Sequence, residues 1–168
     1  LAGTLNKLCE TVAKRQGKLA RIQLELPNSD AVPAHLRTPI REISQQLLRN
    51  ALVHGIEESE TRLAQNKAAV GEIRISLQAE EGDWVLRCHD DGAGIDPEKI
   101  RQQLLDKGLL PADEIAVMTP AQLAQTIFMP GVSTARQEDE DAGRGIGLDL
   151  VRHTTSKLGG RMRLLSTP

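Results

Sequence analysis

Hydrophobic and polar positions follow one another along this chain in patterns that predict both helices and strands. Residues 4–15 carry leucine or valine at every third or fourth position, which is typical of a helix with one buried face. Residues 18–26 alternate between apolar and polar side chains and predict a half-buried strand. From 39 to 54 the hydrophobic positions return to helical spacing, so we expect an amphipathic helix that Gly55 ends.

The remaining elements are predicted in the same way. The polar stretch 57–69 is expected to hold a short exposed helix. Two alternating stretches, 73–79 and 84–90, predict strands joined by the turn Glu81-Gly82-Asp83. Further along we expect helices at 97–107, 120–128 and 145–158, and a last strand at 160–166. Hairpin-paired strands interleaved with helices predict an α/β two-layer sandwich.

Composition narrows the possible functions. A chain of 168 residues fits one domain, and a net charge of −2 with intermixed signs does not indicate a nucleic-acid partner. Trp84 and Phe128 are the aromatic residues, too few for a base-stacking platform. The sequence has no apolar run of the roughly 20 residues that cross a membrane. Cys9 and Cys88 lack metal-binding spacing and read as reduced thiols of a cytoplasmic protein.

Asn50 is the first candidate for chemistry, within the run Arg49-Asn50-Ala51-Leu52-Val53-His54-Gly55. Mg²⁺ takes oxygen ligands and keeps several waters, so one carboxamide oxygen together with a triphosphate makes a sensible site. An asparagine that merely hydrogen-bonds the local backbone is the alternative interpretation.

Asp90 ends the strand predicted at 84–90 and leads into Asp91-Gly92-Ala93-Gly94. A carboxylate there can accept a hydrogen bond from an exocyclic amine such as that of adenine, and the glycines allow the backbone to come close to a base. Taken singly, an ordinary turn explains this segment equally well, because Asp-Gly is a common turn signal.

A glycine-rich segment, Gly143-Arg144-Gly145-Ile146-Gly147, opens the last predicted helix. Backbone N–H groups at a helix N-terminus bind phosphate oxygens, and glycines remove the Cβ obstruction. The spacing is not the Gly-x-Gly-x-x-Gly of dinucleotide sites, and the chain contains no P-loop motif. The preceding residues, 129–143, predict a mobile lid over a triphosphate, in which Ser133 and Thr134 could donate to phosphate oxygens.

His35-Leu36-Arg37-Thr38-Pro39 is similar to the phospho-accepting histidine box of sensor kinases. One residue is missing between the histidine and the leucine, and the segment lies 15 residues before Asn50, without room for a dimerisation hairpin. A proline near a helix start explains the segment structurally, so we do not expect His35 to be a phosphate acceptor.

In this order and at these spacings, the segments around Asn50, Asp90, Phe128 (Ile127-Phe128-Met129-Pro130-Gly131) and Gly143 resemble the four nucleotide-binding boxes of the GHKL superfamily. Over roughly residues 15–166 the chain looks like the ATP-binding domain of CheA-like histidine kinases. The resemblance implies a Bergerat-type fold: a mixed, largely antiparallel sheet with helices on one face, in a single domain over 1–168.

The resemblance also implies roles for individual residues. Asn50 would bind Mg²⁺, and Asp90 would recognise adenine. The other expected ATP-binding residues are Arg49, His54, Gly92, Gly94, Lys99, Phe128, Ser133, Thr134, Gly143, Arg144, Gly145, Ile146 and Gly147. Two departures stand out: Gln46 occupies the place of the family's His or Glu, and Val53 replaces the usual Asp.

By resemblance, the chain is the catalytic domain of a two-component sensor histidine kinase in the cytoplasm. It would present Mg·ATP to a histidine on a phosphotransfer or dimerisation domain of the same kinase, with a response regulator downstream. The second hypothesis is a GHKL ATPase of the topoisomerase, chaperone or mismatch-repair kind. Such an enzyme needs a general base to activate water, and the Gln46 amide does not titrate. A degenerate nucleotide sensor is the third hypothesis. We expect a monomeric fragment of a larger kinase that does not phosphorylate itself.

Overall fold

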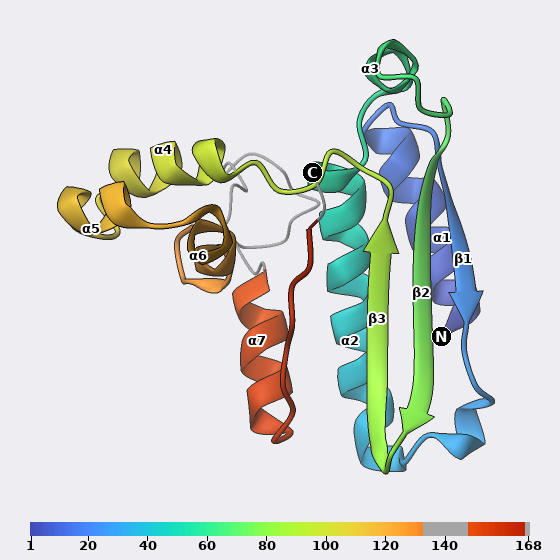
Figure 1. Cartoon of the computed structure of the whole chain (residues 1–168). Helices are drawn as coiled ribbons and strands as arrows, with labels where there is room; N and C mark the ends of the chain where they lie inside the picture. Colours follow the sequence, from blue (N-terminus) through green and yellow to red (C-terminus); the bar gives the residue numbers. More distant parts are fainter. Residues whose placement is uncertain (133–147, 167–168) are drawn as a thin grey trace. The chain divides into compact units, whose positions relative to one another are not determined.

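A computed structural model of the chain describes residues 1–132 and 148–166. The chain divides into two compact units, residues 1–93 and residues 94–168 (Figure 1).

The first unit is built on a mixed sheet. Among the described residues its strands are β1 (Ala20–Glu25), β2 (Gly71–Glu80) and β3 (Asp83–Asp90), in the order β1-β2-β3. β1 pairs with β2 in parallel, and β2 pairs with β3 in antiparallel fashion. The β2–β3 turn has positive φ at Glu81 (49°) and Gly82 (92°), as a two-residue hairpin loop requires. The alternation read from the sequence placed all three strands within two residues at each end.

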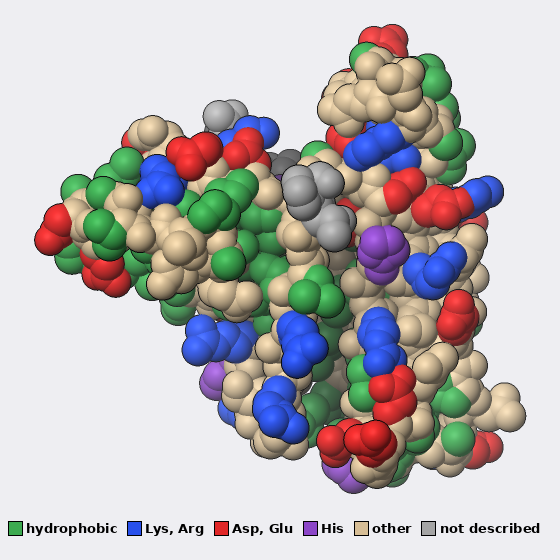
Figure 2. Space-filling model, in the orientation of Figure 1, with side chains coloured by type: hydrophobic (Ala, Val, Ile, Leu, Met, Phe, Trp, Pro, Cys, Tyr) green, Lys and Arg blue, Asp and Glu red, His purple; other side chains and the backbone are tan. Residues whose placement is uncertain are grey.

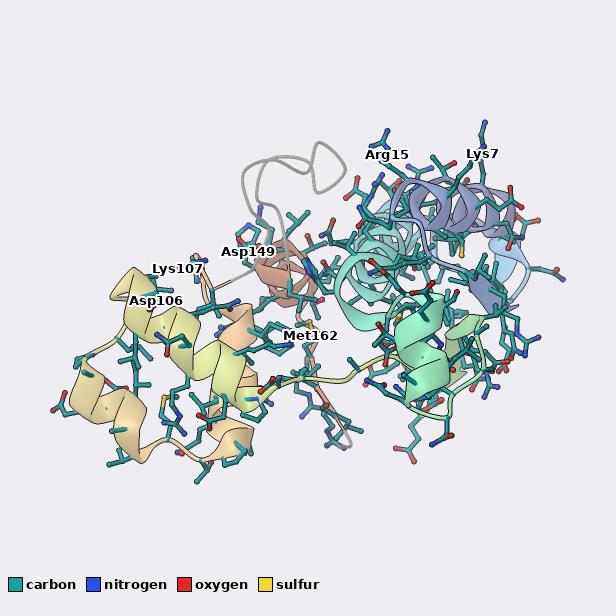
Figure 3. All side chains as sticks on the ribbon, turned by 90° about the horizontal axis from the view of Figure 1, so that it is seen from above. Lys7, Arg15, Asp106, Lys107, Asp149 and Met162 are labelled. Carbon is teal, nitrogen blue, oxygen red and sulfur yellow. The ribbon has the colours of Figure 1, made fainter. Side chains whose placement is uncertain are left out.

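Two helices cover one side of this sheet, α1 (Ala2–Arg15) and α2 (Ala34–Asn50) (Figure 1). Lys7 and Arg15 lie on the outward side of α1 (Figure 3). The core between the helices and the sheet consists of Leu5, Cys9, Val12, Ala13, Leu48, Ala51, Leu52, Ile56, Ile73 and Ile75. The predicted α/β architecture, with helices on one face of a mixed sheet, is confirmed.

The helix predicted at 39–54 has different limits in the structure. α2 begins five residues earlier, so Pro39 lies inside the helix although its ring removes one backbone donor. At the other end, residues Ala51–Gly55 form a π-helix, in which the Ile56 N–H donates to the Ala51 carbonyl at 2.7 Å. Such π segments are rare and often occur at functional sites. Two short elements complete this unit, a 3-10 helix (Ser29–Ala31) and α3 (Ser59–Ala64).

The outer face of the sheet carries charges of both signs, and Figure 2 shows basic and acidic side chains interspersed over it. Arg21 of β1 forms an ion pair with Glu72 of β2, and the Arg87 guanidinium of β3 pairs with Glu80 at 2.5 Å. Cross-strand pairs of opposite charge stabilise a sheet modestly. The intermixed charge inferred from composition therefore extends to the level of individual strand neighbours.

The second unit is helical in its described part. Its helices are α4 (Pro97–Lys107), α5 (Ala112–Val117), α6 (Pro120–Gln125), a 3-10 helix (Thr126–Phe128) and α7 (Leu148–Lys157). α4 matches the helix expected at 97–107: Pro97 opens it, and the structure adds a cap from the Asp96 side chain and an end at Gly108 with φ 58°. The buried core of this unit is Ile100, Leu104, Ile115, Leu123 and Val132.

Two features of the second unit differ from expectation. The prediction of a strand at 160–166 is wrong, because no residue in this range is assigned to a strand. A strand requires a paired neighbour, and within residues 94–132 and 148–166 no strand is present to provide one. α5 was missed, since it is one and a half turns long and has a single buried side chain, Ile115. No helix within the described ranges combines the length and apolar character needed to cross a membrane.

Candidate functional site

The end of α2 holds the first group of candidate residues. Gln46, Arg49 and Asn50 lie in the last two turns of α2, and His54 lies in the π-helix that follows. The wide π turn leaves carbonyl groups that need other donors, and the Lys18 ammonium supplies them: it donates to the carbonyls of Leu52 at 2.8 Å and Val53 at 2.7 Å. Burial lowers the pKa of Lys18, and the negative charges of Glu58 and Glu57 offset only part of this shift. Lys18 therefore fixes the helix end that bears the candidate residues.

Asn50 carries a buried polar atom without a partner. Its Nδ2 is buried, and no group within the described part of the chain accepts a hydrogen bond from it. An unsatisfied buried polar atom costs roughly 1–3 kcal/mol, so such an atom is a reason to look for a ligand. A flip of the carboxamide would present its oxygen at the same place. Asn50 thus fits the chemistry of a group that contacts a ligand or a cation.

Asp90 is the last residue of β3, where it pairs with Ile73 of β2. The Gly92 N–H donates to its Oδ1 at 3.0 Å. Burial raises the pKa of Asp90 above its ordinary value of 3.8, with the Gly92 hydrogen bond acting against this shift. A partly buried carboxylate held in one orientation is suited to accept a hydrogen bond from a ligand donor.

Gly55 and Gly92 bring the end of the π-helix against the loop after β3. A Cβ on Gly92 would lie 2.2 Å from the Gly55 carbonyl oxygen, and one on Gly55 would lie 2.8 Å from Oδ1 of Asp90. The Ala93 N–H donates to the same Gly55 carbonyl at 2.9 Å. Position 92 therefore requires glycine, because the obstacle there is backbone, whereas a Cβ at position 55 would displace the Asp90 carboxylate. This contact places His54-Gly55 beside Asp90-Gly92.

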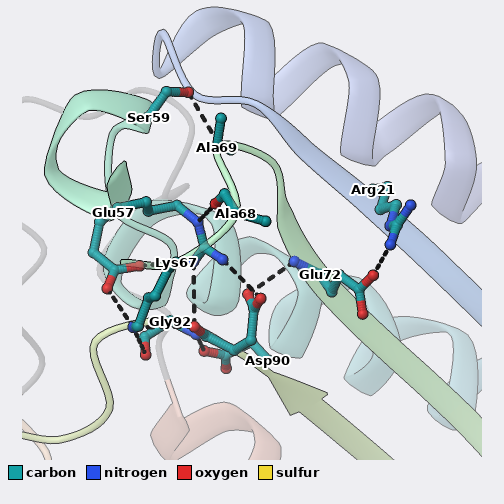
Figure 4. Close-up of polar contacts among 11 residues, drawn as sticks. Arg21, Glu57, Ser59, Lys67, Ala68, Ala69, Glu72, Asp90 and Gly92 are labelled. Carbon is teal, nitrogen blue, oxygen red and sulfur yellow. Dashed lines mark hydrogen bonds and ion pairs between the residues drawn. The ribbon is translucent and has the colours of Figure 1, made fainter. Parts of the chain in front are cut away.

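A cluster of charged side chains supports the same loop, and sequence reasoning missed it. The cluster consists of Glu57, Arg62, Lys67 and Asp91; Figure 4 shows Glu57 and Lys67 beside Gly92. The Arg62 side chain is 0% exposed, and its guanidinium contacts Glu57 at 2.9 Å and Asp91 at 2.7 Å. Lys67 contacts Glu57 at 2.7 Å. Glu57, Arg62 and Lys67 come from the stretch 57–69, which read as an exposed polar helix, and no periodicity marks their pairing with Asp91 of the Asp90-Gly94 motif.

The second unit carries three of the expected site residues within the described range, Gly94, Lys99 and Phe128. Lys99 lies in the first turn of α4 with its side chain 81% exposed, 3.8 Å from Asp96. Phe128 ends the 3-10 helix and is buried. Gly94 has φ 69°, a conformation that glycine adopts without strain.

Part of the expected site lies outside the described residues. The predicted phosphate ligands in question are Ser133, Thr134, Gly143, Arg144, Gly145, Ile146 and Gly147. Most of the predicted lid at 129–143 falls there as well. Within residues 1–132 and 148–166, no group of three or more His, Cys, Asp or Glu side chains could hold a metal ion.

Comparison with known proteins identifies the family of this chain. Residues 36–168 match the family described as histidine kinase-, DNA gyrase B-, and HSP90-like ATPase. The chain belongs to this ATPase family, and membership implies ATP binding.

The relatives of this chain show which members of the ATPase family it is similar to. The chemotaxis protein CheA of Rhizobium meliloti is 34% identical over 164 residues, covering 98% of this chain and 21% of that protein. A gliding motility regulatory protein of Myxococcus xanthus is 36% identical, covering 92% of this chain and 20% of its own length. The CheA of Halobacterium salinarum is 33% identical over the whole chain and 25% of its own length.

These relatives support an ATP-binding catalytic domain of a histidine kinase. They confirm the resemblance to CheA-like kinases that the sequence motifs indicated. The chain spans about a fifth of the length of the first two curated relatives, so the activity and partners of a whole protein are a matter for proposal.

Proposed function

We propose that residues 1–168 act as one ATP-binding domain that presents Mg·ATP to a histidine on another domain of the same kinase. The observation that carries this proposal is the buried Asn50 Nδ2, which has no hydrogen-bond partner among the described residues, at the end of α2 in a chain of this ATPase family. An amide oxygen at this place suits Mg²⁺, which binds few protein oxygens when a triphosphate supplies others. The domain would work in the cytoplasm.

Adenine recognition is assigned to Asp90 in this proposal. Its carboxylate is fixed through Oδ1 by the Gly92 N–H, and Oδ2 would accept from the adenine amino group. The close packing of Gly55 against Asp90 and Gly92 would let the purine approach the backbone, with Gly94 completing the loop. A carboxylate acceptor favours adenine over a base with a carbonyl at the same position.

The phosphate end would be held by basic side chains and backbone donors. Arg49, His54 and Lys99 would contact phosphate oxygens, with Phe128 shaping the segment before the loop. The remaining phosphate contacts are predicted for Ser133, Thr134, Gly143, Arg144, Gly145, Ile146 and Gly147. When bound, Mg²⁺ would neutralise charge on the phosphate oxygens, and the protein's own contribution would be positioning for in-line attack.

The acceptor is proposed to be a histidine of a phosphotransfer or dimerisation domain, with a response regulator downstream. Gln46 lies one helical turn before Asn50, where hydrolysing relatives would need a base, and an amide cannot take a proton from water at neutral pH. Transfer to a supplied histidine is therefore favoured over hydrolysis.

Two measurements test the proposal. Calorimetry with ATP, with and without Mg²⁺, is expected to give binding that Mg²⁺ strengthens. Incubation with γ-labelled ATP is expected to label a supplied histidine domain with acid-labile phosphate, while this chain alone stays unlabelled. His35, His54, His89 and His153 are the candidates that self-labelling would implicate. ATP binding without transfer would favour the nucleotide-sensor hypothesis, and rapid release of free phosphate would favour the ATPase.

A further inference from the structure

The charged cluster of Glu57, Arg62, Lys67 and Asp91 is more than a structural ion pair, because of what its cations contact. The Arg62 guanidinium donates to the Ala68 carbonyl at 2.7 Å as well as to the two carboxylates. Asp91 uses its other oxygen to accept from the Glu72 N–H at 2.8 Å. An arginine buried to this extent remains charged, so it needs such a complete set of partners. The cluster thereby joins α3, β2 and the loop after β3.

Both cations of the cluster also reach one particular peptide group, the one between Asp91 and Gly92. Arg62 and Lys67 each donate to the Asp91 carbonyl oxygen at 3.2 Å. Lys67 donates in addition to the next carbonyl, that of Gly92, at 2.9 Å. These are the two residues that directly follow Asp90.

The N–H of this same peptide group is the donor that holds the Asp90 carboxylate. In a planar trans peptide the C=O and N–H point in opposite directions, so fixing the oxygen fixes the direction of the hydrogen. Arg62 and Lys67 hold the Asp91 carbonyl oxygen, which belongs to the same peptide group as the Gly92 N–H. The Gly92 N–H therefore points at Oδ1 of Asp90, 3.0 Å from the nitrogen. Positive charge at the oxygen also polarises the peptide and strengthens its N–H as a donor.

Glu57 keeps the lysine in place. Its side chain is 7% exposed and accepts from Lys67 at 2.7 Å and from Arg62 at 2.9 Å. Burial by itself would raise the pKa of Glu57, but the hydrogen bond and charge of Lys67, a backbone hydrogen bond and the hydrogen bond from Arg62 together lower it. Glu57 is thus ionised and binds both cations at neutral pH.

We propose that Lys67 and Arg62 are positioning residues for adenine recognition, which orient the Asp91–Gly92 peptide and through it the Asp90 carboxylate. The inference rests on the proposed function, in which Asp90 binds the adenine amino group. Neither cation contacts the nucleotide. Their effect on binding passes through the Gly92 N–H and should therefore depend on Asp90.

The test is a double-mutant cycle between Lys67 and Asp90, read out as the Kd for Mg·ATP. Lys67→Met keeps the aliphatic stem and removes the ammonium. It is expected to weaken ATP binding about tenfold, the effect of losing one charged hydrogen bond that acts on the nucleotide indirectly, through the Gly92 N–H. In an Asp90→Asn background the same substitution is expected to change the Kd less than about twofold. Lys14→Met, at an exposed position of α1, is the matched control and should leave the Kd unchanged.

Two further readouts separate positioning from general support of the fold. Ammonium ion should restore part of the ATP affinity of Lys67→Met, because the substitution vacates the volume of the ammonium group between the Glu57 carboxylate and the two carbonyls, and Lys67 is partly exposed. The Gly92 amide proton should move upfield in the NMR spectrum of the variant, since its donor strength falls. Should Lys67→Met fail to fold, Lys67→Arg is expected to keep ATP affinity within about threefold, because it keeps a cation at this place.

The outcomes distinguish this inference from the function on which it rests. Wild-type protein that does not bind ATP would overturn both. Wild-type binding with equal losses from Lys67→Met in the two backgrounds would overturn the positioning role alone, and so would a loss in Lys67→Arg as large as the expected tenfold.

Discussion

Gly92 packs so closely on Gly55 that a Cβ at position 92 would lie 2.2 Å from the Gly55 carbonyl oxygen. The neighbouring atom belongs to the backbone, so it cannot move aside as a flexible side chain would. The contact joins the end of the π-helix to the loop after β3, which makes it the physical link between the Asn50 and Asp90 parts of the candidate site.

Gly92→Ala is therefore expected to destabilise the fold by about 1–3 kcal/mol, because the backbone must shift to admit the methyl group. It should also weaken ATP binding, since the shift displaces the N–H that holds Asp90. Urea unfolding and calorimetry measure the two effects. Gly3→Ala is the control: a Cβ there meets no atom within 4 Å, so no loss of stability is expected. Equal stability of the two variants would contradict the close packing described for Gly92.

Asp90→Asn is expected to weaken ATP binding by about 10- to 100-fold, as the loss of a charged acceptor does. The free energy of unfolding should not decrease, because burial raises the pKa of Asp90, and the ionised carboxylate therefore destabilises the unliganded protein at neutral pH. Calorimetry gives the affinity, and thermal unfolding gives the stability. Asp83→Asn, at an exposed position where β3 begins, serves as the control. A folded Asp90→Asn variant with normal affinity would move adenine recognition to another residue.

The affinity for ATP should decrease as the pH is lowered, because Asp90 becomes protonated. In the proposed site the adenine amino group would need the ionised carboxylate, and burial raises the pKa of Asp90 above 3.8. Full affinity is thus expected well above the raised pKa, with a loss as the pH falls through it. Asp90→Asn should lack this component, and the difference between the two curves removes the titration of the nucleotide itself. Parallel curves for wild type and variant would exclude Asp90 as the titrating group.

Asn50→Ala is expected to remove most of the Mg²⁺ dependence of ATP binding. The substitution deletes the one carboxamide that the proposed site offers to the metal, while relieving a buried Nδ2 that lacks a partner in the described residues. The variant should therefore be at least as stable without nucleotide as the wild type. Calorimetry with and without Mg²⁺ is the measurement. Mg²⁺ dependence equal to that of the wild type would place the metal ligand elsewhere.

Lys18→Met should destabilise the π-helix end of α2 by about 1–3 kcal/mol, because the carbonyls of Leu52 and Val53 lose their common donor. Hydrogen exchange is expected to rise at residues 52–56 more than in the sheet. Lys7→Met, on the outward side of α1 (Figure 3), is the matched control and should change neither quantity. Unchanged exchange in Lys18→Met would show that the π segment does not depend on this lysine.

Short-range patterns were enough for many of the elements. The strands at 20–25, 71–80 and 83–90 follow from side-chain alternation, since one face of each is buried and the period of two is unavoidable. α4 was expected at 97–107, and the structure shows why local sequence sufficed: a capping Asp, an opening Pro and a closing Gly all act within a few residues. The strand expected at 160–166 failed for the opposite reason, because a strand depends on a partner that its own sequence does not specify.

The sequence by itself determined the residue types of the candidate site, an Asn on a core helix and an Asp before glycines at a strand end, and the family to which these motifs belong. It could do so because each motif is local, and the geometry of a single helix or strand sets the spacing of its residues. The tertiary structure decided how these groups are held. Lys18 reaches carbonyls 34 and 35 residues away, and Arg62 reaches Asp91 across 29 residues. No periodicity encodes such contacts, because they arise only when folding brings separate segments together and a buried charge must find its partners.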